Sequence, residues 1–390
     1  MCESDIVIAL LRSAITDGKI DKEIKLNIKK ENLGCLYRLA KRHDLAHLVG
    51  LSLDKNGLLS GESDAKNVFM KEISLAVFRH EKNTYEENRV AEFLEEQGIE
   101  HLLLKGSHFR SLYPEPWMRT SADVDILVKQ EKLDLVIKLL CEKFAYKYEE
   151  KHSHDVSLYS PSNVHLELHY NLNSEKKLPE ADELLENLWD YTCVVEGCKY
   201  RRKFIPEMFY FYHIAHAAKH FINGGCGIKF FIDTWLYKNS NEYDSEKVAN
   251  LLKKGDLDLF DEKVGRLVDV WFNGANRDDL TDRIESFIIG GGVYGSSENR
   301  VKIAQARTKN KSKFKYIWGK IFLKYDAMKY MYPVLEKHRW LLPFCQIHRW
   351  FAKLFKGRAK NAVNDIKINN SITTEQSMET SMFLKDVGLK

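Results

Sequence analysis

The sequence has few of the features that mark disordered, secreted or membrane-spanning chains. Its 390 residues include only 7 prolines and 44% hydrophobic residues, which excludes extended disorder over most of the chain. The 7 cysteines are odd in number and show no zinc-ligand spacing, so we expect reduced thiols and a cytoplasmic location. No apolar run approaches the ~20 residues of a membrane-spanning helix, and the N-terminus lacks the basic start and long apolar run of a signal peptide.

A strong excess of one charge is also missing. The 60 Lys and Arg residues against 56 Asp and Glu give a net charge of +4, which is too small to indicate nucleic acid as a partner. Basic residues alternate with aromatic residues between Arg307 and Lys324, and the stretch from Arg349 to Lys360 is also basic. This pattern suits single-stranded nucleic acid or an anionic membrane surface. The sequence favours a third interpretation, a helix with a buried aromatic face and solvated lysines.

The chain is too long for one ordinary core, and its periodicity predicts several segments. The expected fold class is α+β, with a small mixed β-sheet core flanked by N- and C-terminal helical regions. Short apolar or alternating runs predict strands at 99–104, 124–128, 156–159 and 164–170. The expected segments are an N-terminal helical region (1–95), an α/β core (96–200), a C-terminal helical domain (201–356) and a loosely ordered polar tail (357–390).

Gly106 and Ser107 directly follow the first predicted strand and begin a short predicted helix. Glycine lets a phosphate approach the backbone, and the free N–H groups of a helix start favour an anion. The Ser107 hydroxyl adds a donor. Lys105, just before them, is a further candidate phosphate ligand, although its side chain can also point away from the site. A Gly-Ser pair alone is equally typical of an ordinary turn.

Asp123 and Asp125 lie two residues apart on the next predicted strand, so both carboxylates share one face. Carboxylates this close repel one another unless a cation lies between them. Mg²⁺ prefers one or two carboxylates together with phosphate oxygens, and Mn²⁺ is the alternative ion. Glu167, between His165 and His169 on a later strand, is the candidate third carboxylate for activating an acceptor hydroxyl. Each carboxylate alone could also be a solvated strand residue.

In this order the motifs resemble the DNA-polymerase-β-like nucleotidyltransferase superfamily. The stretches Leu-Leu-Lys-Gly-Ser-His-Phe (103–109) and Arg-Thr-Ser-Ala-Asp-Val-Asp-Ile-Leu-Val (119–128) resemble a bacterial family called uncharacterised nucleotidyltransferases. The segments His-Leu-Glu-Leu-His-Tyr (165–170) and His-Ala-Ala-Lys-His (216–220) are also similar to it. The resemblance spans about residues 30–350.

This resemblance implies Mg²⁺-dependent transfer of a nucleoside monophosphate from a nucleoside triphosphate, such as ATP, to a hydroxyl group of an unidentified acceptor. Gly106 and Ser107 would hold the triphosphate. Asp123 and Asp125 would bind the metal, with Glu167 as the third carboxylate. Asp123 lies seventeen positions after Gly106, a longer spacing than in the simplest superfamily members, but the narrower family shares this loop.

Further candidates lie in that loop and on a later helix. Arg119 could contact phosphate, or form a salt bridge to the neighbouring acid. His213, His216 and His220 share one helical face, and Asp233 follows after a glycine turn. They could line the cleft, with His216, Lys219 and His220 contacting the nucleotide, or pack in the core, or bind a transition metal. A catalytically inactive nucleotide-binding module and a His-based metallophosphohydrolase therefore remain as alternative functions.

Overall fold

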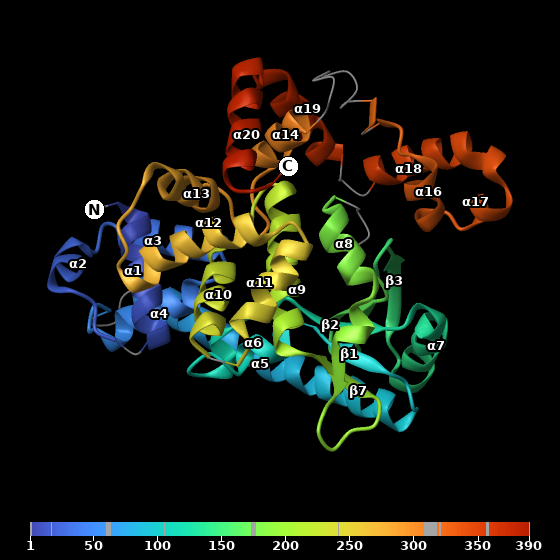
Figure 1. Ribbon diagram of the computed structural model, residues 1–390, viewed down its shortest axis with the longest axis horizontal. Helices are drawn as coiled ribbons and strands as arrows, with labels where there is room; N and C mark the ends of the chain where they lie inside the picture. Colours follow the sequence, from blue (N-terminus) through green and yellow to red (C-terminus); the bar gives the residue numbers. More distant parts are fainter. Residues whose placement is uncertain are drawn as a thin grey trace.

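The computed structural model describes residues 2–16, 18–59, 64–104, 106–172, 177–240, 242–307, 318–319, 321–355 and 359–389. Lys105, one of the candidate phosphate ligands, lies outside these residues. In Figure 1 the chain begins with helices at the left, passes through a sheet at the lower right and continues through helices above the sheet. This arrangement confirms the predicted α+β class, a mixed sheet flanked by helices from both ends of the chain.

The sheet has seven strands in the order β3-β4-β5-β2-β1-β7-β6. Neighbouring strands are antiparallel except in the pairs β2/β5 and β1/β7, which are parallel. The strands are β1 (His101–Leu103), β2 (Asp123–Val128), β3 (Lys147–Lys151), β4 (Asp155–Tyr159), β5 (His165–His169), β6 (Thr192–Val194) and β7 (Arg201–Phe204). The predicted strands correspond to β1, β2, β4 and β5, whereas β3, β6 and β7 are additional.

Alternation along β2 separates two environments. Val124, Ile126 and Val128 are buried in a core beneath α5 (Asp64–Glu96) and α7 (Leu133–Phe144), which cover one face of the sheet. Asp123 and Asp125 point to the opposite face, because successive side chains of a strand alternate. The local pattern of β2 thus leaves two carboxylates on the face that the covering helices do not occupy.

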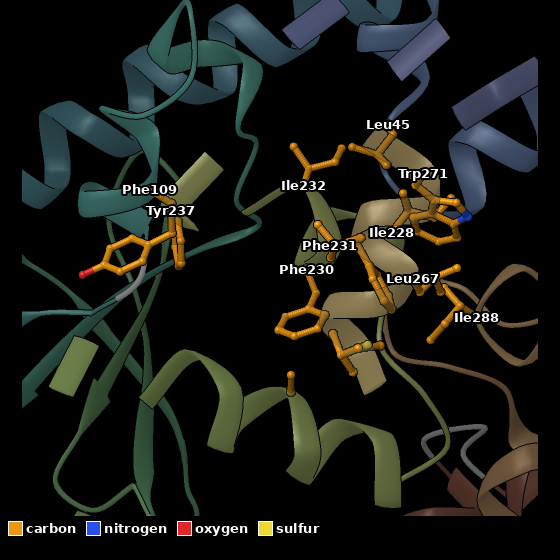
Figure 2. Packing of buried hydrophobic residues seen from close by; sticks show 14 of the residues in the cluster. Leu45, Phe109, Ile228, Phe230, Phe231, Ile232, Tyr237, Leu267, Trp271 and Ile288 are labelled. Atoms are coloured by element: carbon orange, nitrogen blue, oxygen red, sulfur yellow. The ribbon is translucent and has the colours of Figure 1, made fainter. Parts of the chain in front are cut away.

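The helices before and after the sheet share one hydrophobic core. Figure 2 shows Leu45, which follows the third helix, in the same hydrophobic cluster as Trp271, Leu267 and Ile288 from the C-terminal half of the chain. The N-terminal helices are α1 (Glu3–Thr16), α2 (Lys22–Asn27), α3 (Leu33–Arg42), α4 (Ala46–Lys55) and α5. The two ends of the chain therefore stabilise each other around the sheet, while the predicted boundaries between the four segments stay a prediction.

The later helices follow the sheet strands and continue to the end of the described chain. The short helices α6 (Gly106–Arg110) and α8 (Pro179–Glu186) lie between strands. The C-terminal helices are α9 (Pro206–Ile222), α10 (Ile228–Ser240), α11 (Ser245–Lys254), α12 (Asp258–Val268), α13 (Asp279–Ile289), α14 (Ser297–Ala306), α16 (Tyr325–Met331), α17 (Val334–Lys337), α18 (Leu342–Phe355), α19 (Ala359–Ser371) and α20 (Thr374–Asp386). No helix in the described ranges is both long enough and apolar enough to span a bilayer.

The expectation of a loosely ordered tail is wrong, because two helices, α19 and α20, form there and pack on α14 (Figure 1). A capping box between Thr373 and Gln376 begins α20. Phe383 and Leu384 then bury themselves in the main core. The tail is polar overall, but it contains a few apolar side chains that can pack on the core. The burial of these side chains stabilises the helices although the local sequence pattern is weak.

Candidate active site

The parallel pairing of β2 with β5 brings the predicted carboxylates together. Asp125 lies directly opposite Glu167 in the register, and Asp123 lies opposite His165. Because paired residues of neighbouring strands point to the same face, the side chains of Asp123, Asp125 and Glu167 form one half-buried cluster. His169 completes the cluster, with its Nε2 atom 2.9 Å from Asp125 Oδ1 and 3.4 Å from Glu167 Oε2.

The electrostatics of the cluster are those of a site built for a cation. Burial, together with the charges of Asp125 and Glu167, raises the pKa of Asp123 to about 7. Burial alone would lower the pKa of His169, but its hydrogen bonds to Asp125 and Glu167 raise that pKa to about 10. In the absence of a metal, the imidazolium of His169 therefore balances part of the negative charge that a divalent ion would otherwise balance.

The donor atoms also fit a metal ion. The described part of the chain contains two groups of three residues whose ligand atoms lie within 4.8 Å of one another inside each group. Glu167 belongs to both groups. One group adds Asp123 and His165 to Glu167, and the other adds Asp125 and His169. Carboxylates suit Mg²⁺, and the combination with imidazole also suits Mn²⁺ and other first-row ions. His165 is oriented by Ser157 Oγ at 3.2 Å and by stacking on Tyr159.

The cluster faces a cleft with a volume of about 470 Å³. The cleft is lined by the sheet, by α9 and α10, and by loops from both the N-terminal and the C-terminal helical regions. His216, Lys219 and His220 of α9 line it, as predicted, together with Gly106. The structure thus brings the predicted carboxylates and the predicted α9 residues to one cavity.

Gly106 and Ser107 occupy different positions relative to this cleft. Gly106 begins α6 and lines the cleft, whereas Ser107 is half-buried and is not among the lining residues. The short helix is fixed by Arg110, whose Nη2 atom donates to both carboxylate oxygens of Glu87 on α5 at 2.6 and 2.7 Å. Phe109 packs between Phe209 and His213, so α6 is anchored to α9 as well.

Arg119 pairs with Asp233 of α10 and not with the neighbouring Asp123. Its Nε and Nη2 atoms donate to the carboxylate at 2.8–3.1 Å, and the Tyr113 hydroxyl donates to the same carboxylate at 2.8 Å. Arg119, Asp233 and Tyr113 are all buried. The guanidinium also lies 5.1 Å from the centre of the Phe109 ring. Arg119 therefore holds the loop in place through α10 while it lines the cleft.

Both helical regions clamp the rest of this loop, residues 116–122. His47 of α4 bonds to the Met118 carbonyl at 2.7 Å, and the Asn83 side chain of α5 donates to the Ser121 carbonyl at 3.1 Å. Lys229 Nζ of α10 donates to the Thr120 carbonyl at 2.8 Å and lies 3.0 Å from Asp44 Oδ2. The long spacing between Gly106 and Asp123 thus contains an ordered loop that fixes the start of β2.

The three histidines of α9 do not form a metal centre. His213 is buried and bonds to Thr234 Oγ1 at 2.9 Å, while Asp233 is occupied by Arg119. His216 and His220 lie side by side, with their Nε2 atoms 3.2 Å apart. Among the described residues, the groups able to hold a metal lie on β2 and β5 instead. The His-based metal site predicted as an alternative is therefore wrong, because helix packing buries His213 and diverts Asp233.

The sequence reading missed Tyr294, which lies at the mouth of the cleft. The glycine-rich loop 290–295 carries it, and Gly295 has a φ of +71°. A Cβ atom at Gly295 would lie 2.0 Å from the Gly224 carbonyl oxygen, so the close approach of these two loops requires glycine. The Tyr294 ring is 6.0 Å from that of His220, although 68% of the residue is exposed. The run of three glycines in the sequence was the signal that could have pointed to this loop.

Comparison with known proteins supports the same interpretation. The family described as uncharacterised nucleotidyltransferase matches residues 29–273, which is more than half of the chain. A crystal structure of an antigenic nucleotidyltransferase-like protein from Paracoccidioides brasiliensis is 17% identical, with a TM-score of 0.27, over 44% of this chain and 87% of that chain. No curated protein matches the sequence. The chain belongs to the family of uncharacterised nucleotidyltransferases.

Proposed function

We propose that the protein transfers a nucleoside monophosphate from a nucleoside triphosphate to a hydroxyl group. The observation that carries this proposal is the β2/β5 register, which sets Asp125 beside Glu167 and leaves Asp123 on the same face of the cleft. A triphosphate brings several negative charges, so a site of three carboxylates can accept it only together with metal ions. Membership of the nucleotidyltransferase family supports the same reaction type.

In the proposed reaction the acceptor oxygen forms a bond to the α-phosphorus while the bond from that phosphorus to pyrophosphate breaks. The acceptor hydroxyl loses its proton at the carboxylate cluster. Asp123, Asp125 and Glu167 would hold Mg²⁺ or Mn²⁺, and the bound ion would neutralise charge on the phosphates and lower the pKa of the hydroxyl. His165 and His169 orient the carboxylates and can supply further ligand atoms.

The opposite wall of the cleft is proposed to bind the nucleotide. Lys219, His216 and His220 of α9 line the cavity, and so does Gly106 at the start of α6. Arg119 is assigned a positioning role, because its guanidinium is committed to Asp233. Ser107 and Lys105 retain their predicted phosphate contacts as part of the proposal, and a cytoplasmic location also remains proposed.

The proposal is tested on the purified full chain with each α-labelled triphosphate and either Mg²⁺ or Mn²⁺. We expect metal-dependent release of pyrophosphate and transfer of label to a component of a metabolite extract, identified by a mass increase of one nucleoside monophosphate. Mn²⁺ should act at a lower concentration than Mg²⁺, because His165 and His169 favour it. Metal-dependent nucleotide binding without pyrophosphate release would instead support the inactive binding module.

Tyr294 is expected to stack on the base of the bound nucleotide. Partial desolvation of the hydroxyl and the charges of Asp123, Glu167 and Asp125 raise the pKa of Tyr294 to about 12, and an ordinary tyrosine is also uncharged at neutral pH, so the ring adds no charge beside a triphosphate. Stacking of a base on an aromatic side chain contributes about 1–3 kcal/mol. Tyr294→Ala should therefore weaken metal-nucleotide binding by about 10- to 100-fold, whereas Tyr294→Phe should bind as wild type does. Titration with a fluorescent nucleotide measures both.

Tyr148→Ala provides the matched control, since this tyrosine is 52% exposed on β3 and does not line the cleft. It should leave nucleotide affinity unchanged. Equal affinity of the Tyr294→Ala variant and wild type for every triphosphate would show that the ring does not contact the base.

A further inference from the structure

The segment that contains α16, α17 and α18 forms a small body at the upper right of Figure 1. Its own core is limited to Met328, Leu335 and Cys345, with a few partly buried neighbours. The helices α16 and α18 contact each other, and a short 3-10 turn, Arg339–Leu341, leads into α18. The segment lies beyond the region that matches the family, which ends at residue 273.

Two polar side chains of helix α18, Gln346 and Arg349, lie on its inner face. Gln346 Nε2 donates to the Leu323 carbonyl at 2.6 Å, and Arg349 Nη2 donates to the Ile321 carbonyl at 2.5 Å. Arg349 is only 2% exposed and Gln346 6% exposed. A helix on the surface of a water-soluble domain normally turns such residues to solvent and its apolar residues inward.

The opposite face of the helix is apolar and uncovered. Phe344, Ile347 and Phe351 are three and four residues apart, so they share one face, and each is more than half exposed. Trp340, in the turn before α18, extends the same spacing and is 69% exposed. These four residues are called the α18 outer face below. The aromatic face expected between Arg307 and Lys324 lies mostly outside the described residues, and Trp318, which is described, is 52% exposed.

Positive charge is concentrated in a longer stretch, residues 307–360, that includes this segment and its flanks in the sequence. Residues 307–360 contain 15 Lys and Arg residues and two acids, Asp326 and Glu336, a net charge of +13. Since the whole chain carries +4, the other residues carry −9. Among the described side chains, three basic residues that are close in sequence to the α18 outer face are exposed: Lys324, Lys337 and Arg339. Apolar exposure and positive charge thus coincide in one short stretch of a chain that is acidic elsewhere.

We propose that the α18 outer face docks on the surface of a lipid bilayer that carries anionic headgroups. The apolar side chains would enter the boundary between headgroups and acyl chains, and the surrounding lysines and arginines would contact the headgroups. Tryptophan and phenylalanine favour this boundary. With 14 residues, α18 is shorter than the ~20 residues needed to cross a bilayer, so it lies in the surface.

Two other occupants fit the observations less well. A single-stranded nucleic acid would be attracted by the charge, but the face includes Ile347, and aliphatic side chains do not offer bases a stacking surface. A second copy of this chain, docked through the same face, would bring two segments of +13 together, and like charges oppose such an interface. An anionic bilayer satisfies the charge and the apolar face at once.

Co-sedimentation of the full-length protein with vesicles tests this proposal. We expect at least about tenfold more binding to vesicles of phosphatidylglycerol and phosphatidylcholine than to phosphatidylcholine alone, since each basic residue near an anionic surface contributes about 1 kcal/mol. Raising NaCl from 0.1 to 0.5 M should release most of the bound protein. Equal binding to both kinds of vesicle, or none to either, overturns the proposal without any variant.

The variant Phe344→Ser/Ile347→Ser/Phe351→Ser should lower the partition coefficient onto anionic vesicles by about 100-fold or more, because each side chain loses favourable burial. The control Val68→Ser/Leu75→Ser/Phe78→Ser changes three exposed apolar residues of α5 and should bind as wild type does. Unchanged vesicle binding of the α18 variant, or equal loss in the α5 control, overturns the assignment of the face.

Two further readouts separate the other occupants. Light scattering after gel filtration reports whether wild type is a dimer that the α18 variant dissociates. Fluorescence anisotropy with a labelled oligo(U) strand reports nucleic-acid binding. The lipid proposal fails if dimerisation or oligo(U) binding depends on the α18 outer face while the protein does not bind anionic vesicles. Metal-dependent nucleotide binding by the α18 variant confirms that it is folded, and failure of the proposed function would leave the vesicle results unaffected.

Discussion

Replacing Asp125 with asparagine is expected to lower kcat/KM for pyrophosphate release by at least about 10³-fold. The substitution keeps the shape of the side chain and an oxygen that can accept from His169, but it removes one charge from the proposed metal site. Stabilisation of the reacting phosphates by bound metal amounts to several kcal/mol, and a loss of about 4 kcal/mol corresponds to this factor. Initial rates at saturating Mn²⁺ and at nucleotide concentrations well below KM measure the effect.

Asp134→Asn is the matched control, because Asp134 is an exposed aspartate on α7, on the covered side of the sheet. This variant should keep the wild-type rate. The Asp125→Asn protein should unfold close to the wild-type temperature, because the repulsion among the carboxylates falls while the His169 imidazolium loses one charged partner. Wild-type turnover by Asp125→Asn would remove the β2 carboxylates from the mechanism.

The buried pair of Arg119 and Asp233 is expected to be the most sensitive point of the fold outside the carboxylate cluster. Asp233→Ala leaves the guanidinium of Arg119 buried, and an uncompensated charge in a protein interior costs about 3–5 kcal/mol. The Tyr113 hydroxyl also loses its acceptor. Urea unfolding should show a lower free energy of unfolding by about this amount.

The same substitution should also reduce turnover, because loop 116–122 leads directly into Asp123. A misplaced supporting contact behind metal ligands typically lowers activity by about 10- to 100-fold. Asp279→Ala removes an exposed partner of Arg283, 3.6 Å away, and should change stability by no more than about 1 kcal/mol. The interpretation fails if the Asp233→Ala and Asp279→Ala proteins are equally stable.

Several elements were predictable because local spacing dictates them. The alternation of Asp123, Val124, Asp125 and Ile126 already places both carboxylates on one face and the apolar residues on the other. The run after Pro206 predicts α9, and its four-residue spacing brings His216 and His220 together. The strands β3, β6 and β7 were not predicted, since they are short or charged and gain their stability from pairing with neighbouring strands, β3 and β6 at the two edges and β7 between β1 and β6.

Other features depended on contacts between distant parts of the chain. No local pattern indicates that Asp233 accepts from Arg119, or that Lys229 and His47 hold the loop before β2. The same limit applies to Tyr294, which reaches the cleft because two glycine loops meet. In each case the partner is chosen by the packing of a core that both ends of the chain share.

The sequence by itself determined the carboxylate pair of β2, the mixed α+β character and the family of this protein, because side-chain direction along a strand follows from backbone geometry alone. The tertiary structure decided that Glu167 lies beside Asp125, that the α9 histidines line a cleft without forming a metal centre, and that α18 turns its apolar face outward. Strand register and helix orientation are set by burial summed over the whole molecule, and no segment carries that information alone.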